Sequence, residues 1–294
     1  MKRKIFTLIL LIGFSTALIS CKDKKADLVA TFYPHYDILN TIAKDKLETK
    51  LLVPFGSEVH SYSPSPKDIE MINNSKLFVY ASDTLDVWVN DLVNTDINYI
   101  NMFNEIEVEF ADDIGATVHY WTDPFVFLDM INVLKAEIIK IDPANEDFYT
   151  KNANDYINEI LATHDELTAF LNTAKNKQLY FAGHNALGGF AYRYNITITS
   201  LIEHFSPEAE QTIKQIENII NALKETNTSY LFIEELVEPR LAETIKRELQ
   251  KDNLNIVLLE LHGYHNITID QAKRGITYAN LFKQNTTNIK KALN

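Results

Sequence analysis

The chain has 294 residues, of which 28 are Lys or Arg and 40 are Asp or Glu, so its formal net charge is -12, and 46% of its residues are hydrophobic. This apolar fraction suffices for one large or two medium globular domains and excludes a disordered chain. The acidic balance argues against a nucleic-acid-binding protein, because a surface that follows phosphates needs clustered Lys and Arg. With the single cysteine Cys21 the chain can form neither an internal disulfide nor a thiolate cluster. A metal site would therefore be built from His, Asp and Glu.

The beginning of the chain has the pattern of a secretory signal. A short basic segment is followed by an almost entirely apolar run up to residue 19, and then by Ser20 and Cys21. The apolar run is too short for a comfortable membrane span, which takes about 20 residues. Residues 18–21, LISC, resemble a bacterial lipobox, in which the cysteine is acylated and becomes the first mature residue. We therefore expect a lipoprotein signal peptide at residues 1–20 and an acylated Cys21, rather than a buried cysteine in an uncleaved anchor.

The charged segment at residues 21–27 is expected to be a short tether. Stable anchoring needs two acyl chains or more, and bacterial lipoprotein processing supplies several at one cysteine. The mature protein is therefore expected on the extracytoplasmic face of a bacterial membrane, with its folded part starting at about residue 28.

Apolar runs alternate with amphipathic segments in the first half of the mature chain. The run at 77–80 is continuously apolar, as in parallel strands that are buried on both faces. Asp123 followed by Pro124 predicts a helix start, because Asp is a good N-cap and Pro suits the first helical position. In chain order, the pattern predicts a strand at 28–32, a helix at 36–43, a strand at 51–54, a helix at 67–73, a strand at 77–80 and a helix at 123–141.

A long helix is predicted at about 145–173, where apolar residues recur at helical spacing without an internal Pro or Gly. The alternation of strands and helices restarts after it. The second half is predicted to contain strands at 178–182, 196–201, 230–233 and 256–259 and helices at 211–224 and 239–249. The fold class is therefore α/β, with two domains of parallel strands flanked by helices on either side of a helical spine. The expected boundaries are 28–144 for the N-terminal domain, 145–174 for the spine helix and 175–294 for the C-terminal domain.

Three histidines stand at strand-to-helix or loop-to-helix junctions, where an α/β sheet presents side chains to a ligand. They are His60 in VPFGSEVHSYSPSP, His119 in ATVHYWTDP and His184 in FAGHNALGGFAYRYN. No local His-x-x-x-His spacing is present, so a shared site requires the two domains to face each other. Spacing alone leaves open the alternative that each histidine is bonded separately within its own loop.

These strings, with the lipobox upstream and LLELHGYHNIT downstream, resemble the metal-binding solute-binding lipoproteins of bacterial zinc and manganese ABC transporters. The resemblance is colinear over residues 28–294. It implies two pseudo-related α/β domains joined by one long helix, with the metal in the cleft between them. It also implies that His60, His119 and His184 are three of the metal ligands.

The fourth ligand of that family is a carboxylate, or a water in some members, placed after the strand that precedes the final helices. Glu260 occupies that place, directly after an apolar run. His262 and His265 are less favoured alternatives, and a water is another. Glu234 is expected to orient one of the ligand histidines, because a metal-bound imidazole usually donates its other N–H to a carboxylate or a carbonyl.

The donor set favours Zn²⁺, with Mn²⁺ as the alternative. Three neutral imidazoles and one carboxylate form a tetrahedral set that suits zinc, whereas manganese prefers more oxygen. Family members tuned to Mn²⁺ tend to exchange the third histidine for a carboxylate, and this sequence keeps His184. One departure weakens the preference for zinc: several zinc members carry a long histidine-rich loop, but residues 90–117 contain no histidine.

The resemblance implies a monomeric extracytoplasmic receptor that captures Zn²⁺ and delivers it to an ABC transporter permease with its ATPase. Such a receptor catalyses no reaction. The alternative is a lipid-anchored zinc-dependent hydrolase that uses the same histidines. The sequence offers no nucleophile elbow and no oxyanion loop for that alternative. A role in surface adhesion is claimed for some family relatives, but the sequence offers no motif for it.

Overall fold

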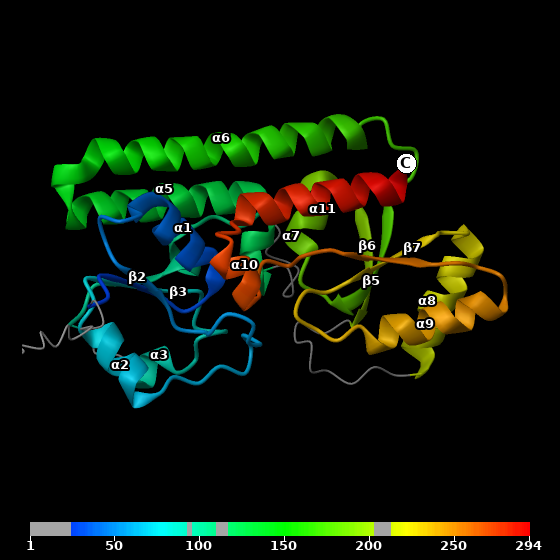
Figure 1. Cartoon of the computed structure of the whole chain (residues 1–294), viewed down its shortest axis with the longest axis horizontal. Helices are drawn as coiled ribbons and strands as arrows, with labels where there is room; N and C mark the ends of the chain where they lie inside the picture. Colours follow the sequence, from blue (N-terminus) through cyan, green and yellow to red (C-terminus); the bar gives the residue numbers. More distant parts are fainter. Residues whose placement is uncertain (1–24, 93–95, 110–116, 203–212) are drawn as a thin grey trace, which may run out of the picture.

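The computed structural model describes residues 25–92, 96–109, 117–202 and 213–294. The predicted signal peptide and Cys21 lie outside these residues. Figure 1 shows two lobes side by side, each built around its own sheet, with helix α6 (Glu146–Leu171) running along both. Within the described residues, no helix is both long enough and apolar enough to cross a membrane.

Each lobe contains a four-stranded sheet in which every neighbouring pair of strands is parallel. The strand order is β2-β1-β3-β4 in the first sheet and β6-β5-β7-β8 in the second. The strands of the first sheet are β1 Leu28–Ala30, β2 Thr49–Leu51, β3 Leu77–Tyr80 and β4 Tyr99–Asn101. Those of the second are β5 Gln178–His184, β6 Thr197–Ile202, β7 Tyr230–Ile233 and β8 Val257–Glu260. The predicted α/β class with two parallel sheets is confirmed.

Helices connect the strands and cover the sheets. In the first lobe they are α1 Tyr33–Ala43, α2 Pro66–Asn73, α3 Val89–Leu92, α5 Pro124–Ile141 and the short 3-10 turns η1 Met102–Glu105, η2 Tyr120–Thr122 and η3 Pro143–Asn145. After α6 come α7 Gly188–Tyr194, α8 Ile213–Thr226, α9 Arg240–Lys251, α10 Ile269–Lys273 and α11 Tyr278–Leu293. The predicted start of α5 is confirmed, because the Asp123 carboxylate accepts a hydrogen bond from the Phe125 N–H at 2.8 Å.

Two elements at the edges of the first sheet differ from the prediction. The strand predicted at 51–54 is assigned to Thr49–Leu51, although its pairing with β1 continues through the N–H groups of Leu52 and Val53. Pro54 ends the ladder because it has no N–H to donate. Strand β4 was not predicted, since it has only three residues and begins with the exposed Tyr99.

The two lobes share one hydrophobic core. Its largest cluster runs from Leu28 in β1, through Ile160 and Leu167 of α6, to Phe181 in β5 and Phe282 in α11. Figure 1 shows α5 and α11 lying beneath successive parts of α6, on the same side of both sheets. Because the apolar faces of the two lobes are continuous, the lobes form one packed unit rather than two domains on a flexible joint.

Smaller clusters cover the opposite faces of the sheets. Val29 and Phe78 pack there in the first lobe, and Leu231 and Ile245 in the second. Successive residues of a strand point to opposite faces of the sheet, and hydrophobic clusters cover both of these faces. Both faces of each sheet are therefore buried, as is usual for parallel sheets. Ala26 also packs into the cluster that contains Val29 and Phe78, although it was predicted to belong to the tether.

An ion pair joins the lobes. The Arg193 guanidinium on α7 donates to the Asp123 carboxylate at the start of α5, with Nε–Oδ1 3.0 Å and Nη2–Oδ2 2.9 Å. The Asp123 side chain is completely buried, and Arg193 also covers the Phe125 ring. Breaking such a pair by removing one partner is expensive, because a buried charge is left alone. The contact therefore fixes the segment that ends at Asp123 against the second lobe.

Asp37 joins three helices in the shared core. Its carboxylate on α1 accepts hydrogen bonds from the Tyr156 hydroxyl on α6 and from the Tyr278 N–H at the start of α11, the latter at 3.1 Å. Burial raises the pKa of Asp37 to about 7, although these bonds oppose the change. The folded protein therefore binds a proton at Asp37 more readily than the unfolded chain does.

This shift makes the stability contribution of Asp37 depend on pH. Between pH 5 and 7 the unfolded carboxyl is ionised while the folded one is protonated, so the free energy of unfolding falls as pH rises through this range. We expect Asp37→Asn to gain stability relative to the wild type by about 2 to 3 kcal/mol on going from pH 5 to pH 8. Denaturant unfolding of the metal-free protein measures this difference, with the exposed Asp147→Asn as control. A difference that stays constant with pH would contradict the assignment.

Candidate metal centre

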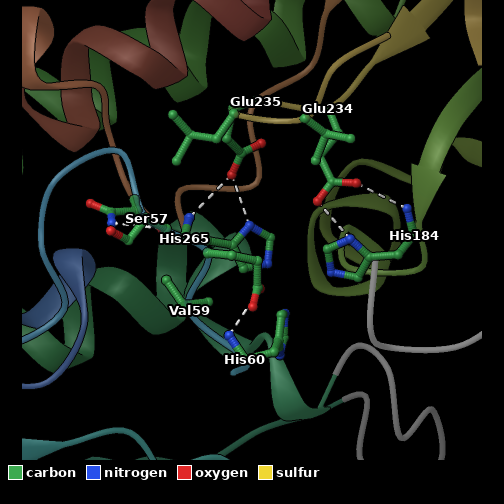
Figure 2. Close-up of a pocket in the computed structure, with 11 residues that line it drawn as sticks. Ser57, Val59, His60, His184, Glu234, Glu235 and His265 are labelled. Carbon is green, nitrogen blue, oxygen red and sulfur yellow. Dashed lines mark hydrogen bonds and ion pairs between the residues drawn. The ribbon is translucent and has the colours of Figure 1, made fainter. Parts of the chain in front are cut away.

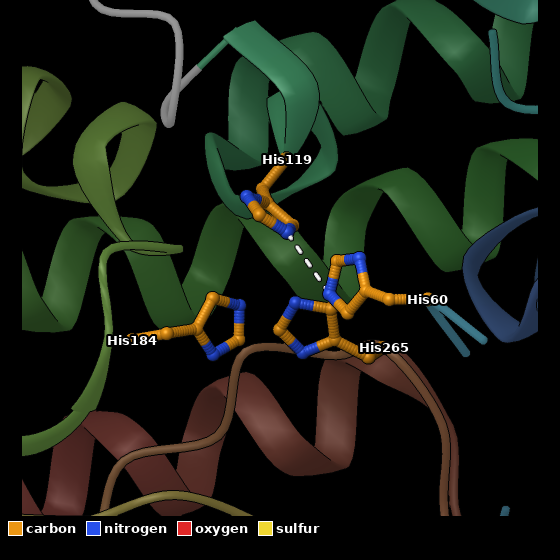
Figure 3. Close-up of side chains that lie close together, drawn as sticks. All are labelled: His60, His119, His184 and His265. Carbon is orange, nitrogen blue, oxygen red and sulfur yellow. Dashed lines mark hydrogen bonds between the residues drawn. The ribbon is translucent and has the colours of Figure 1, made fainter. Parts of the chain in front are cut away.

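Four histidines meet between the lobes. His60 lies in the loop after β2, His119 directly before η2, His184 at the end of β5 and His265 in the loop after β8. One nitrogen of each ring lies within 4.8 Å of the corresponding nitrogens of the other three. Figure 3 shows the four rings pointing toward a common centre. The structure therefore brings together the three histidines singled out from the sequence and adds His265, one of the two less favoured alternatives.

The four rings form a tetrahedron. All six distances between ring centroids fall between 4.9 and 5.7 Å. A square arrangement would make the two diagonals about 1.4 times as long as the edges, which this narrow spread excludes. The Nε2 atoms of His60 and His119 are 3.5 Å apart. Tetrahedral zinc with Zn–N bonds of about 2.0–2.1 Å places its donor atoms about 3.4 Å apart, so this pair already has the required spacing.

Two consecutive glutamates at the end of β7 hold two of the rings from behind. Nδ1 of His184 lies 2.7 Å from Oε1 of Glu234, and Nδ1 of His265 lies 2.8 Å from Oε1 of Glu235. Figure 2 shows the two carboxylates side by side, each linked to its own imidazole. Nε2 of His184 and Nε2 of His265 remain buried without a hydrogen-bond partner. These two nitrogens are therefore available as ligands.

The sequence places Glu234 and Glu235 together after the strand at 230–233, and the orienting role was predicted for Glu234. The structure gives a ring contact to both residues. Strand β7 lies between β5 and β8. Two acids that directly follow it therefore lie between the histidines at the ends of both neighbouring strands.

Two glycines allow the carboxylates to approach. A Cβ at Gly183 would lie 2.9 Å from Oε2 of Glu234, and a Cβ at Gly263 would lie 2.5 Å from Cε1 of His265 and 3.3 Å from Oε1 of Glu235. Any larger residue at Gly263 would thus displace the His265 ring. The chain turns at the next residue, Tyr264, whose φ of 64° lies in the left-handed region.

The charges of the site follow from its burial. Burial, assisted by the neighbouring His265 and His184, lowers the pKa of His60 to about 3. Burial alone would lower the pKa of His265 and raise that of Glu235, but the neighbouring charges outweigh burial in both cases. The pKa of His265 is consequently raised, and His262 and His265 together hold the pKa of Glu235 well below its usual range.

Hydrogen bonds between the lobes hold the loops that carry the histidines. The Asn266 side chain, next to His265, donates to the carbonyls of Pro54 and Ser57 in the His60 loop at 2.8 and 3.0 Å. The Trp121 indole, two residues after His119, donates to the Gly263 carbonyl at 3.0 Å. The positions of the rings are therefore fixed by contacts of the protein itself.

Glu260, the carboxylate favoured from the sequence as fourth ligand, is not brought to the cluster. Its side chain accepts a hydrogen bond from Gln284 on α11 at 2.8 Å. His262 is buried beside the cluster, but its Nδ1 accepts the Tyr264 N–H at 2.8 Å. The physical reason is the path of the chain, since Glu260 still belongs to β8 and faces α11, and only the turn at Tyr264 returns the backbone to the other rings.

The arrangement is chemically suited to Zn²⁺. Four imidazoles whose rings are arranged as a tetrahedron suit zinc in both donor type and geometry, whereas Mn²⁺ prefers oxygen donors and higher coordination. The fold and the site together define a two-lobed α/β metal-binding protein whose site lies at the carboxyl ends of two parallel sheets. Ligand sites in open α/β sheets are found at these ends.

The chain belongs to the family described as zinc-uptake complex component A, periplasmic, whose model matches residues 28–292. Among curated proteins it is 28% identical over 292 residues to the high-affinity zinc uptake system protein ZnuA of Bacillus subtilis, covering 92% of this chain and 89% of that protein. It is 26% identical to the zinc-binding lipoprotein AdcA of Streptococcus pneumoniae over 91% of this chain, but it spans only 56% of the length of AdcA.

Solved structures show the same fold. The metal-dependent lipoprotein YcdH of Bacillus subtilis matches with a TM-score of 0.77 and 26% identity, covering 92% of this chain and 99% of that one. The Zn(II)-bound ZnuA-like domain of AdcA from Streptococcus pneumoniae matches with a TM-score of 0.77 and 23% identity over the same shares of the two chains.

The contacts of Gly263 predict an effect on metal binding. We expect Gly263→Ala to weaken Zn²⁺ binding about tenfold or more, because the added methyl group pushes His265 out of the tetrahedron. Competition titration against a chromophoric zinc chelator measures the affinity. Ser57→Ala, in the wall of the same cavity, is the control and should bind as the wild type does. An unchanged affinity in Gly263→Ala would show that the site tolerates the displacement.

Proposed function

We propose that this protein is an extracytoplasmic receptor that binds Zn²⁺ through His60, His119, His184 and His265 and delivers it to an ABC transporter permease working with its ATPase. The observation that carries the proposal is the tetrahedron of four imidazoles, two of which have buried Nε2 atoms without a partner. Membership of a zinc-uptake family supports the same cargo, as do the zinc-binding relatives. His265 takes the place that the sequence analysis gave to Glu260.

Binding rather than catalysis is supported by the completeness of the donor set. A catalytic zinc keeps one position open for water, whereas four protein nitrogens fill the tetrahedron. The cavity beside the histidines measures about 50 Å³, which is room for a few water molecules rather than for an organic substrate. Neither the site nor the family supports the hydrolase alternative, and we propose that the protein is not an enzyme.

Zinc rather than manganese is the proposed cargo. All four donors are nitrogen atoms, and the carboxylate ligand that would have raised the oxygen content of the site lies elsewhere. Manganese remains the comparison ion against which the preference is tested.

We also propose that the protein acts as a monomer held to the membrane by lipid on Cys21. The lipobox at residues 18–21 supports this anchor, and relatives named zinc-binding lipoproteins make the same arrangement reasonable. A receptor on the extracytoplasmic face stays close to the permease that receives its ion.

Alanine substitution of single histidines tests the ligand set. Zinc at about a hundred times its dissociation constant should add about 2.7 kcal/mol to the free energy of unfolding of the soluble form, residues 22–294. We expect this increase to be lost in His265→Ala and in His119→Ala but retained in Glu260→Gln. Manganese should give no comparable increase.

The matched pair in this experiment is His265→Ala and Glu260→Gln, because the two residues are the alternative candidates for the fourth metal ligand. Loss of the zinc effect in Glu260→Gln with retention in His265→Ala would reverse the assignment. Absence of any zinc effect in the wild-type protein would remove the proposed function.

Substitution of the lipobox cysteine tests the anchor. We expect Cys21→Ser to move the protein from the membrane fraction to the soluble extracytoplasmic fraction or the medium, because the acyl chains cannot be attached. Fractionation followed by immunoblotting measures the distribution, and zinc binding by the released protein is the control for folding. A variant that stays with the membrane would show that another element anchors the chain.

A further inference from the structure

The four histidine rings of the proposed site, His60, His119, His184 and His265, are called the cage below. They carry no charge that would offset the charge of the bound ion. Four imidazoles bind a metal as neutral ligands, whereas a carboxylate ligand would bring one negative charge. A divalent cation among rings that are at most 6% exposed, as His119, His184 and His265 are, is costly unless opposite charge is close by. The compensating charge must therefore come from groups behind the rings.

Glu234 and Glu235 are placed to supply it. Each carboxylate is almost fully buried, with side-chain exposures of 7% and 4%, and each contacts the Nδ1 of one ring of the cage. Their second oxygens approach backbone N–H groups, Oε2 of Glu234 that of His184 at 3.2 Å and Oε2 of Glu235 that of Gly263 at 2.8 Å. The same arrangement, a carboxylate that contacts one ring nitrogen and one backbone N–H, thus occurs twice, once toward β5 and once toward the loop after β8.

Orientation alone does not require two buried charges. A backbone carbonyl can accept the Nδ1 proton of a metal-bound imidazole and fix the ring equally well. The chain instead buries two carboxylates, and glycine at positions 183 and 263 leaves room beside them. Two negative charges equal the charge of one divalent ion.

We propose that Glu234 and Glu235 determine which ionic charge the cage accepts, so that it selects a divalent cation over a monovalent cation that also binds imidazole. Each glutamate acts through its histidine and is a positioning and charge-compensating residue rather than a ligand. The proposal rests on the proposed function only in requiring that the four histidines bind a metal ion.

The test compares Zn²⁺ with Cu⁺ in Glu234→Gln, Glu235→Gln and the wild type. Glutamine keeps the shape of the side chain and an oxygen that can accept the Nδ1 proton, but it removes the charge. Zinc affinity is measured by chelator competition, and Cu⁺ affinity by competition with bicinchoninate without oxygen. The exposed Glu238→Gln, which removes the same charge from the nearby surface, is the matched control.

We expect each variant to lose about 10- to 100-fold in zinc affinity while its Cu⁺ affinity changes much less. The ratio of the two affinities should therefore fall at least about tenfold, and Glu238→Gln should leave it unchanged. Equal losses for both ions would show that the glutamates only orient the rings. No loss for either ion would show that they do not act on the cage at all.

Two further measurements separate these outcomes from misfolding and from failure of the proposed function. The Co²⁺-loaded variants should keep the strong visible absorption of a tetrahedral site if the rings hold their positions. Loss of the tetrahedral spectrum would contradict the proposal that the glutamates act by compensating the charge of the ion. Denaturant unfolding of the metal-free variants checks the fold. If the wild-type protein bound no zinc, the proposed function would fail first.

Discussion

The structure depends on one constraint: four imidazoles from four separate segments are held at tetrahedral spacing. Parallel sheets make this possible, because all the strands of such a sheet present their carboxyl ends at the same edge. In this chain His184 ends a strand and His60 and His265 lie in loops that follow strands. Two such edges face each other, and each lobe contributes two rings.

Holding the rings requires that the lobes do not move freely. The shared core beneath α6, the buried pair of Asp123 and Arg193, and the hydrogen bonds of Asn266 all join one lobe to the other. A preformed site lowers the entropy that must be lost on binding. It also keeps two ring nitrogens buried without a hydrogen-bond partner, Nε2 of His184 and Nε2 of His265. Part of the stability of the shared core offsets that cost.

The sequence predicted what is local and missed what depends on the path of the chain. The strands, the start of α5 and the long α6 follow from hydrophobic spacing and capping residues, which act within a few positions. His60, His119 and His184 were selected because each stands at a junction where such folds present side chains. The choice between Glu260 and His265 depended on the turn at Tyr264, and no pattern of the neighbouring residues specifies a left-handed tyrosine. Glu260 is the last residue of β8, and its side chain faces α11.

The position of His60 indicates how an ion can leave so rigid a cage. His119, His184 and His265 are almost completely buried, whereas His60 is only partly buried and lies in a loop that lines the cavity beside the rings. Figure 2 shows it on the opposite side of His265 from the two glutamates. Neither Glu234 nor Glu235 contacts its ring in the way that they contact His184 and His265. Because the lobes share a core, moving the His60 loop, which breaks the two hydrogen bonds from Asn266, costs less than separating the lobes. For the proposed receptor, we therefore expect exchange of the ion to begin at His60 and to leave the other three rings in place.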